Sequence, residues 1–128
     1  MKYLFDNDIS YRIAQMLRAV EVDATALRER YPENTDDSIF LEDLKNGEFD
    51  VFISNNTEQR RIPQERRLLK EAGVISLYFN PFWGKLKFWD QAVWCMARCK
   101  KIEGFCEGTA KGTCADLQAN GTAKYFNL

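Results

Sequence analysis

Acidic side chains crowd the start of the chain, directly after its first apolar segment. Asp6 and Asp8 follow residues 3–5, a short apolar run that is expected to form the first strand. A carboxylate at the tip of a buried strand requires a cation, a network of hydrogen-bond donors or a functional use. Asp8 also has a simpler interpretation, because a carboxylate just before a helix can serve as its N-cap. Asp6 is therefore the first candidate for a catalytic or metal-binding acid.

A further acid, Asp37, lies in the first turn of a predicted helix. This helix is expected to have Asn34 or Thr35 as its N-cap and to run to about Lys45. The residues that share one face of it with Asp37 are apolar: Phe40, Leu41 and Leu44. Asp37 is thus expected to face the sheet, whereas the neighbouring Asp36 can point outward. The alternative is that Asp37 only complements the helix dipole, an interaction worth ~0.3–1 kcal/mol.

Polar side chains also follow the third predicted strand, in the run Ser54-Asn55-Asn56-Thr57. They can orient a water molecule or a phosphate, or they can simply close a turn. The chain contains no histidine, which excludes Ser-His-Asp and Cys-His catalysis and every His-ligated metal site. Carboxyl groups that converge without histidine suit a hard divalent cation such as Mg²⁺. Such an ion can activate water and neutralise a phosphoryl oxygen, which is a route to phosphodiester hydrolysis.

Positive charge is concentrated in the middle of the chain. The basic residues between positions 60 and 70 are Arg60, Arg61, Arg66, Arg67 and Lys70. Further on, Lys85 and Lys87 stand among aromatic residues, of which Trp83 is the best candidate for an exposed ring. Basic residues interleaved with aromatics can bind a single-stranded backbone and stack on its bases. The alternative is a solvated helix face for the arginines and core packing for most of the rings.

The elements that must position these residues alternate along the chain. Its 128 residues are 45% apolar, which is enough for a single domain, residues 1–128, with a buried core. Strands are expected at residues 3–5, 22–27, 51–53 and 74–79. Helices are expected at residues 9–20, 35–45, 63–72 and 88–102, with a break at Asn80-Pro81. The tail is expected to form a hairpin of residues 112–117 and 122–128 around Asn120-Gly121, a type I′ turn signal.

This order predicts an α/β fold, in which a mostly parallel sheet has helices on both faces and an antiparallel C-terminal hairpin. In such sheets ligands bind beyond the carboxyl ends of the strands, where the candidate acids are expected to gather. The net charge of −1 argues against a protein that is basic all over, but not against a local basic face.

The cysteines indicate structure rather than chemistry. Their spacing lacks the close pairs of a zinc site, so buried, reduced thiols are expected at Cys95, Cys99, Cys106 and Cys114. No stretch approaches the ~20 apolar residues of a membrane span. A charge at Asp6 comes too early for a secretory signal, and the cytoplasm is therefore the expected compartment.

The opening Tyr3-Leu4-Phe5-Asp6-Asn7-Asp8-Ile9-Ser10 resembles the N-terminal signature of PIN-like domains. The chain as a whole is similar to the compact PIN-like proteins grouped with VapC-type toxins. Further parallels follow in order: Pro32 through Asp37, Ile53-Ser54, Pro63-Gln64-Glu65-Arg66, Ala72-Gly73-Val74 and Phe88-Trp89-Asp90-Gln91-Ala92. Each motif is short, and the resemblance depends on their order and spacing over nearly the whole chain.

The resemblance implies a three-layer α/β/α fold and Mg²⁺- or Mn²⁺-dependent cleavage of RNA. Asp6 matches the first metal-binding Asp of the family, and Asp37 matches the acid at the start of its second helix. The next family acid stands in a Thr-x-Asp context and aligns with Asn56 in this chain. An amide is a weaker ligand than a carboxylate and cannot act as a base, but Asp8 can compensate for the missing charge.

The leading hypothesis is a metal-dependent endoribonuclease of the VapC toxin type. Asp6 and Asp37 hold the ion in this hypothesis, Asp8 and Asn56 support them, and RNA is the substrate. RNA contacts are assigned to Arg60, Arg61, Arg66, Arg67, Trp83 and Lys85. The alternative is a catalytically degenerate PIN-like module that binds RNA or a protein partner. The resemblance also allows a cognate antitoxin and a homodimer, whereas a phosphatase-like enzyme is disfavoured because the chain has no Gly-rich phosphate-binding loop.

Overall fold

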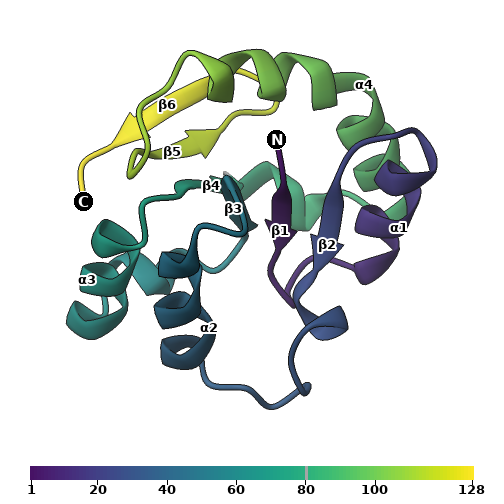
Figure 1. Cartoon of the computed structure of the whole chain (residues 1–128). Coiled ribbons are helices and arrows are strands. Elements are labelled where there is room, and N and C mark those ends of the chain that lie inside the picture. Colours follow the sequence, from purple (N-terminus) through teal and green to yellow (C-terminus); the bar gives the residue numbers. More distant parts are fainter. Residues whose placement is uncertain (80) are drawn as a thin grey trace.

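Within residues 1–79 and 81–128, the part of the chain that the structure describes, six strands form one sheet (Figure 1). The strands of this computed structural model are β1 (Tyr3–Phe5), β2 (Ala24–Ala26), β3 (Val51–Ser54), β4 (Ile75–Phe79), β5 (Cys114–Leu117) and β6 (Ala123–Phe126). Their order is β2-β1-β3-β4-β5-β6, and every neighbouring pair is parallel except β5 and β6. The predicted α/β fold is confirmed. The predicted break at Asn80-Pro81 includes Asn80, which lies outside the described residues.

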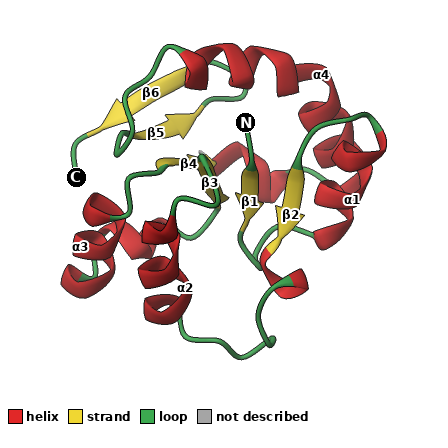
Figure 2. Cartoon of the chain, in the orientation of Figure 1, coloured by secondary structure: helices red, strands yellow, loops and turns green. Residues whose placement is uncertain are grey.

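Helices cover both faces of the sheet and give the predicted α/β/α layers (Figure 2). On one face lie α1 (Tyr11–Ala19) and α4 (Phe88–Glu107), and on the other lie α2 (Asp37–Asp43) and α3 (Pro63–Glu71). Short 3-10 turns connect them: η1 (Leu27–Glu29), η2 (Leu44–Asn46), η3 (Thr57–Arg60) and η4 (Pro81–Lys85). No helix of the described residues is long and apolar enough to cross a membrane.

The central strands are apolar on both sides because helices cover both faces of the sheet. Successive side chains alternate, so Tyr3 and Phe5 pack with α1 and α4, whereas Leu4 packs with α2 and α3. In the same way Phe52 faces α2 and α3. By this alternation the residue after Phe5, which is Asp6, points toward α2 and α3. The pleat of the sheet therefore decides which helices can contribute to a site at the end of β1.

The helix caps correct two of the expected boundaries. Ser10 caps α1, because its hydroxyl accepts a hydrogen bond from the backbone N–H two residues further on, at 3.3 Å. The interpretation of Asp8 as this cap is therefore wrong. Asp36 caps α2 in place of Asn34 or Thr35, and the Thr35 hydroxyl instead donates to a backbone carbonyl of the preceding loop, at 2.7 Å. Asp37 consequently occupies the first position of α2.

The C-terminal hairpin extends the main sheet, because β5 pairs in parallel with β4 before β6 turns back along β5. Its turn differs from the expected type I′ form, which needs positive φ at both central residues. Among the described turn residues only Gly121 has positive φ, at 87°. The Gly121 N–H donates to the Gln118 carbonyl, and Gln118 N–H donates to the Thr122 carbonyl. These bonds define a longer loop in which a type I turn is followed by a left-handed glycine.

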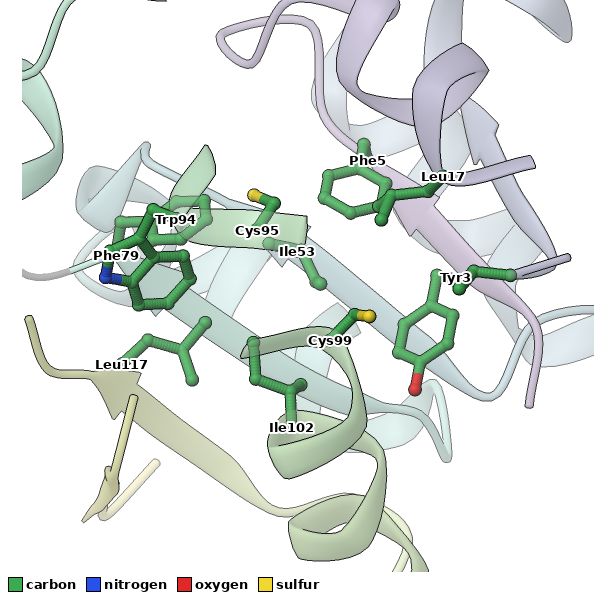
Figure 3. A pocket seen from close by; sticks show the side chains of 11 residues that line it. Tyr3, Phe5, Leu17, Ile53, Phe79, Trp94, Cys95, Cys99, Ile102 and Leu117 are labelled. Carbon is green, nitrogen blue, oxygen red and sulfur yellow. The ribbon is translucent and has the colours of Figure 1, made fainter. Parts of the chain in front are cut away.

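The cysteines are free, as predicted, and most of them are buried. Figure 3 shows Cys99 beside Tyr3, and Cys95 nearer Ile53, among the side chains that line a small apolar cavity of about 20 Å³ between the sheet and α4. A space of this size holds no more than a water molecule. Burial raises the pKa of Cys95 to about 12 and that of Cys106 to about 11, so these thiols stay protonated and inert.

Candidate active site

The carboxyl ends of β1 and β3 meet at one edge of the sheet, where Asp6 and Ser54 stand side by side. The strands pair in parallel with Phe5 opposite Ile53, so the next residue of each strand falls at the same level. Asp6 is buried, and its Oδ2 accepts a hydrogen bond from the Ser54 hydroxyl at 2.7 Å. Its Oδ1 accepts from the Asn7 backbone N–H at 2.7 Å. The carboxyl group is thereby held in one orientation.

Gln59 connects Asp6 to Asp37. Its Nε2 donates to Asp6 Oδ2 and to Asp37 Oδ2, both at 3.0 Å. Its Oε1 accepts a hydrogen bond from the Tyr78 hydroxyl at 2.9 Å. Gln59 comes from η3, directly after β3, and none of its surface is exposed. The two acids that the strand-end argument brings together thus share a single amide donor.

Negative charge accumulates around this pair. Burial raises the pKa of Asp6 despite the hydrogen bonds that it accepts. Partial loss of hydration, followed by the Asp6 charge, raises the pKa of Asp8 to about 7. Asp8 is still exposed at the surface, so solvent screens its interaction with Asp6. Burial, followed by a hydrogen bond with Asp37, raises the pKa of Glu65 to about 7. The charged groups that most affect these carboxyl groups are other carboxylates, so the cluster is short of positive charge.

Oxygen donors with an excess of negative charge fit a hard divalent cation, which prefers carboxylate ligands and water. Asp6 and Asp37 are the residues that could hold it, with Asp8 near the same strand end. In this conformation no three His, Cys, Asp or Glu side chains of the described residues are grouped as a metal cage. The amide of Gln59 bonds to both carboxylates instead.

Asp6, Asp37 and Gln59 all lie in the part of the chain that a protein-family comparison covers. The model of the PIN-like domain family matches residues 1–81. The chain belongs to the PIN-like domain family. None of the curated proteins and none of the solved structures with which the chain was compared matches it. The PIN-like match ends after β4, so α4 and the C-terminal hairpin complete the sheet and its cover beyond the matched segment.

The PIN-like domain places Asn56 differently from its expected catalytic position. Its Oδ1 accepts from the Glu58 N–H at 3.3 Å and caps η3, while its own N–H donates to the Ser54 hydroxyl at 2.9 Å. Gln59 takes the inward position three residues later. Sequence reasoning missed Gln59. The Asn56–Gln59 spacing was a weak signal for it, because residues three apart in a 3-10 turn lie on the same face.

Asp8 also contacts the loop after β3 in this PIN-like domain. Its Oδ2 accepts a hydrogen bond from the Asn55 N–H at 3.0 Å. Glu65 and Tyr78 are further members of the site that sequence reasoning missed. Glu65 is a single acid among arginines, and Tyr78 is one of several aromatic residues in an apolar strand, so neither stood out from its surroundings.

The prediction that Trp83 is an exposed stacking ring is wrong. Only 2% of its surface is exposed, and its ring stacks on Phe79 with centroids 3.8 Å apart and an interplanar angle of 8°. The 3-10 turn η4 directs the indole back over the end of β4, where Trp94 also packs against it edge-on. The exposed tryptophan of the described residues is Trp89, with 76% exposure.

Arg60 and Arg66 are engaged inside the PIN-like domain rather than free to contact RNA. Arg60 is 8% exposed, forms an ion pair with Asp116 at 2.8 Å, and lies over the rings of Tyr78 and Phe126. Arg66 donates to backbone carbonyls of Arg60 and of the last two residues of the chain. The assignment of Arg60 to an RNA-binding surface is therefore wrong, since its charge is buried against the hairpin.

The remaining predicted RNA contacts are exposed: Arg61, Arg67 and Lys85. The ion pairs of Arg61 and Arg67 with Glu58 and Glu71 are solvent-exposed and lie within their own helical turns, at 3.4 and 3.7 Å. Such pairs contribute ~0–1 kcal/mol and break easily. The structure thus leaves these three side chains at the surface.

Proposed function

We propose that this PIN-like domain is a metal-dependent endoribonuclease of the VapC toxin type, which hydrolyses RNA phosphodiesters with a divalent cation held by Asp6 and Asp37. The observation that carries the proposal is that Asp6, at the carboxyl end of β1, and Asp37, at the start of α2, accept hydrogen bonds from the same amide group. Membership of a family with a nuclease-type fold supports it. The absence of histidine agrees with chemistry that depends on carboxylates and a metal.

The residues of the site would divide the work of hydrolysis. Bound to Asp6 and Asp37, Mg²⁺ or Mn²⁺ would supply the activation of water and the neutralisation of a phosphoryl oxygen. Ser54 and the Asn7 N–H keep Asp6 in one rotamer, so the ligand position is set before substrate arrives. Arg61 and Arg67, exposed on the elements that follow β3, would bind phosphates flanking the cleaved bond.

Substitution of the two acids tests this function. Asp6→Asn and Asp37→Asn are each expected to abolish cleavage of a labelled RNA while the far-UV circular dichroism stays that of the wild type. Asp36→Asn is the matched control, because it removes the same charge from an exposed neighbour and asparagine is an equally good N-cap. Full activity of Asp6→Asn, with contaminating ribonuclease excluded, would refute the assignment.

One observation favours the alternative of a catalytically silent module that binds RNA or a protein partner. Gln59 satisfies both carboxylates without any cation. A calorimetric titration with Mn²⁺ separates the two functions. No binding at millimolar Mn²⁺ would favour the silent module, and binding that Asp6→Asn removes would favour the nuclease.

A further inference from the structure

The amide of Gln59 takes the place that a cation would fill between two carboxylates. Ionised carboxylates are acceptors only, so the side of the amide that faces Asp6 and Asp37 must be the NH₂ group. In this orientation the opposite atom, Oε1, accepts a hydrogen bond from the Tyr78 hydroxyl. Burial raises the pKa of Tyr78, so the phenol keeps the proton that it donates. Every polar atom of this buried amide therefore has a partner.

We propose that Gln59 is an internal competitor of the divalent cation: its NH₂ group donates hydrogen bonds to Asp6 and Asp37 in the cation-free protein and has to leave them when a cation binds. The inference rests on the proposed function, because it takes these acids as the ligands. It assigns to Gln59 and Tyr78 a role in setting the affinity of the site. Neither residue is needed to contact RNA for this role.

The competition follows from linkage. A cation and an N–H donor cannot both occupy the space between the same two oxygens, since the donor carries partial positive charge. Hydrogen bonds to ionised groups are among the strongest in proteins. Any such bond present in the cation-free form and lost in the loaded form subtracts from the binding free energy. Gln59 makes two of them, so the site is expected to bind its cation more weakly than the same acids without the amide.

Tyr78 strengthens the competition by holding the amide in place. Without the Tyr78 hydroxyl, Gln59 Oε1 loses the donor that holds it, and the amide can turn away from the two acids at lower cost. Asp6 keeps the Ser54 hydroxyl and the Asn7 N–H whatever happens at Gln59. The fold around Asp6 is therefore expected to tolerate removal of the amide.

The test uses calorimetry at pH 8 to compare the Mn²⁺ affinity of variants with that of the wild type. At this pH protons do not bind the carboxylates in place of the lost Gln59 donor. Gln59→Met keeps the size of the side chain and removes the amide. Its dissociation constant for Mn²⁺ is expected to fall about tenfold or more, the factor that one charge-assisted hydrogen bond can supply. Tyr78→Phe is expected to tighten binding by a smaller factor. Gln64→Met, on the exposed face of α3, is the matched control and is expected to bind as the wild type does.

Thermal denaturation gives a second readout that does not depend on activity. Without Mn²⁺, Gln59→Met is expected to melt below the wild type, and added Mn²⁺ is expected to raise its melting temperature more than that of the wild type. An unchanged affinity of Gln59→Met for Mn²⁺ would overturn the proposal. A weaker affinity would also overturn it, because it would indicate that Gln59 Oε1 is a ligand of the cation.

The outcomes for the inference and for the proposed function are distinguishable. Wild-type binding that Gln59→Met does not change leaves the nuclease proposal intact and refutes the competitor. If Gln59→Met binds Mn²⁺ and the wild type does not, the result supports Gln59 as a competitor of the cation. It also indicates that Gln59 keeps the wild-type domain catalytically silent. Absence of binding in both proteins refutes the competitor and the metal-dependent function together.

Discussion

Arg60 and Asp116 form the least exposed ion pair of the described residues, with side-chain exposures of 10% and 23%. Asp116→Ala would leave the guanidinium buried between the rings of Tyr78 and Phe126 without its partner. Breaking a buried pair from one side costs about 3–5 kcal/mol. Because Asp116 is partly hydrated, we expect the lower end, a loss of about 3 kcal/mol of unfolding free energy. Arg60→Met keeps the apolar packing and leaves the hydrated partner, so a loss of about 1–2 kcal/mol is expected.

Urea unfolding of the wild type, both single variants and the double variant measures these losses and their coupling. A coupling energy of at least about 1 kcal/mol is expected, since the two side chains are in direct contact. Arg61→Met is the control, because its pair with Glu58 is exposed, and its loss should stay within about 0.5 kcal/mol. A loss below about 0.5 kcal/mol in Asp116→Ala, or additive single effects, would refute the inference that Arg60 and Asp116 stabilise the fold as a buried ion pair.

Three further predictions concern pH and the exposure of side chains. The pKa values of Asp8 and Glu65 are raised to about 7 in the folded protein, which therefore binds more protons than the unfolded chain. The free energy of unfolding without divalent cation should consequently fall as the pH rises toward 7. Thermal denaturation between pH 5 and 8 measures this, and a rise of stability over that range would contradict it. Cys95 and Cys106 should react with a thiol reagent at pH 8 only after urea unfolding, and rapid labelling of either of these two thiols in the native protein, located by peptide mapping, would contradict their burial. Trp89→Phe should remove most of the acrylamide-quenchable fluorescence of the native protein without loss of stability, and undiminished quenching would show another tryptophan to be exposed.

Much of the fold could be predicted because local patterns determine it. Strands buried on both faces read as continuous apolar runs, and Pro63 at the start of α3 marks a helix beginning. Asp6 could be found because it follows a strand end, where ligands of such sheets bind, and Asp37 because it shares a helix face with Phe40, Leu41 and Leu44. The hairpin turn was mistaken because Asn120-Gly121 fits two loop lengths, and the pairing of Gln118 with Thr122 selects the longer one.

The rest of the site depends on contacts between distant segments. Gln59 acquires its role from Asp6 and Asp37, which lie 53 and 22 positions away in the sequence. The burial of Arg60 is decided by Asp116, 56 positions further on. The burial of Trp83 could not be predicted for another reason. A sequence pattern of aromatic residues and lysines does not show whether a short 3-10 turn directs an indole into the core or toward solvent.

The pairing of β5 with β4 has a consequence for shorter versions of the protein. The matched family segment ends at residue 81, so a chain cut there would keep β4 but lose its neighbour. All five residues of β4 are buried in the intact protein, and their unpaired N–H and C=O groups would become a bare apolar edge. Such an edge recruits other chains by backbone pairing, so a fragment with both acids intact would aggregate. In the whole protein the hairpin prevents this, because β5 pairs with β4 and the outermost strand, β6, carries the exposed Lys124, a charge that discourages edge-to-edge association.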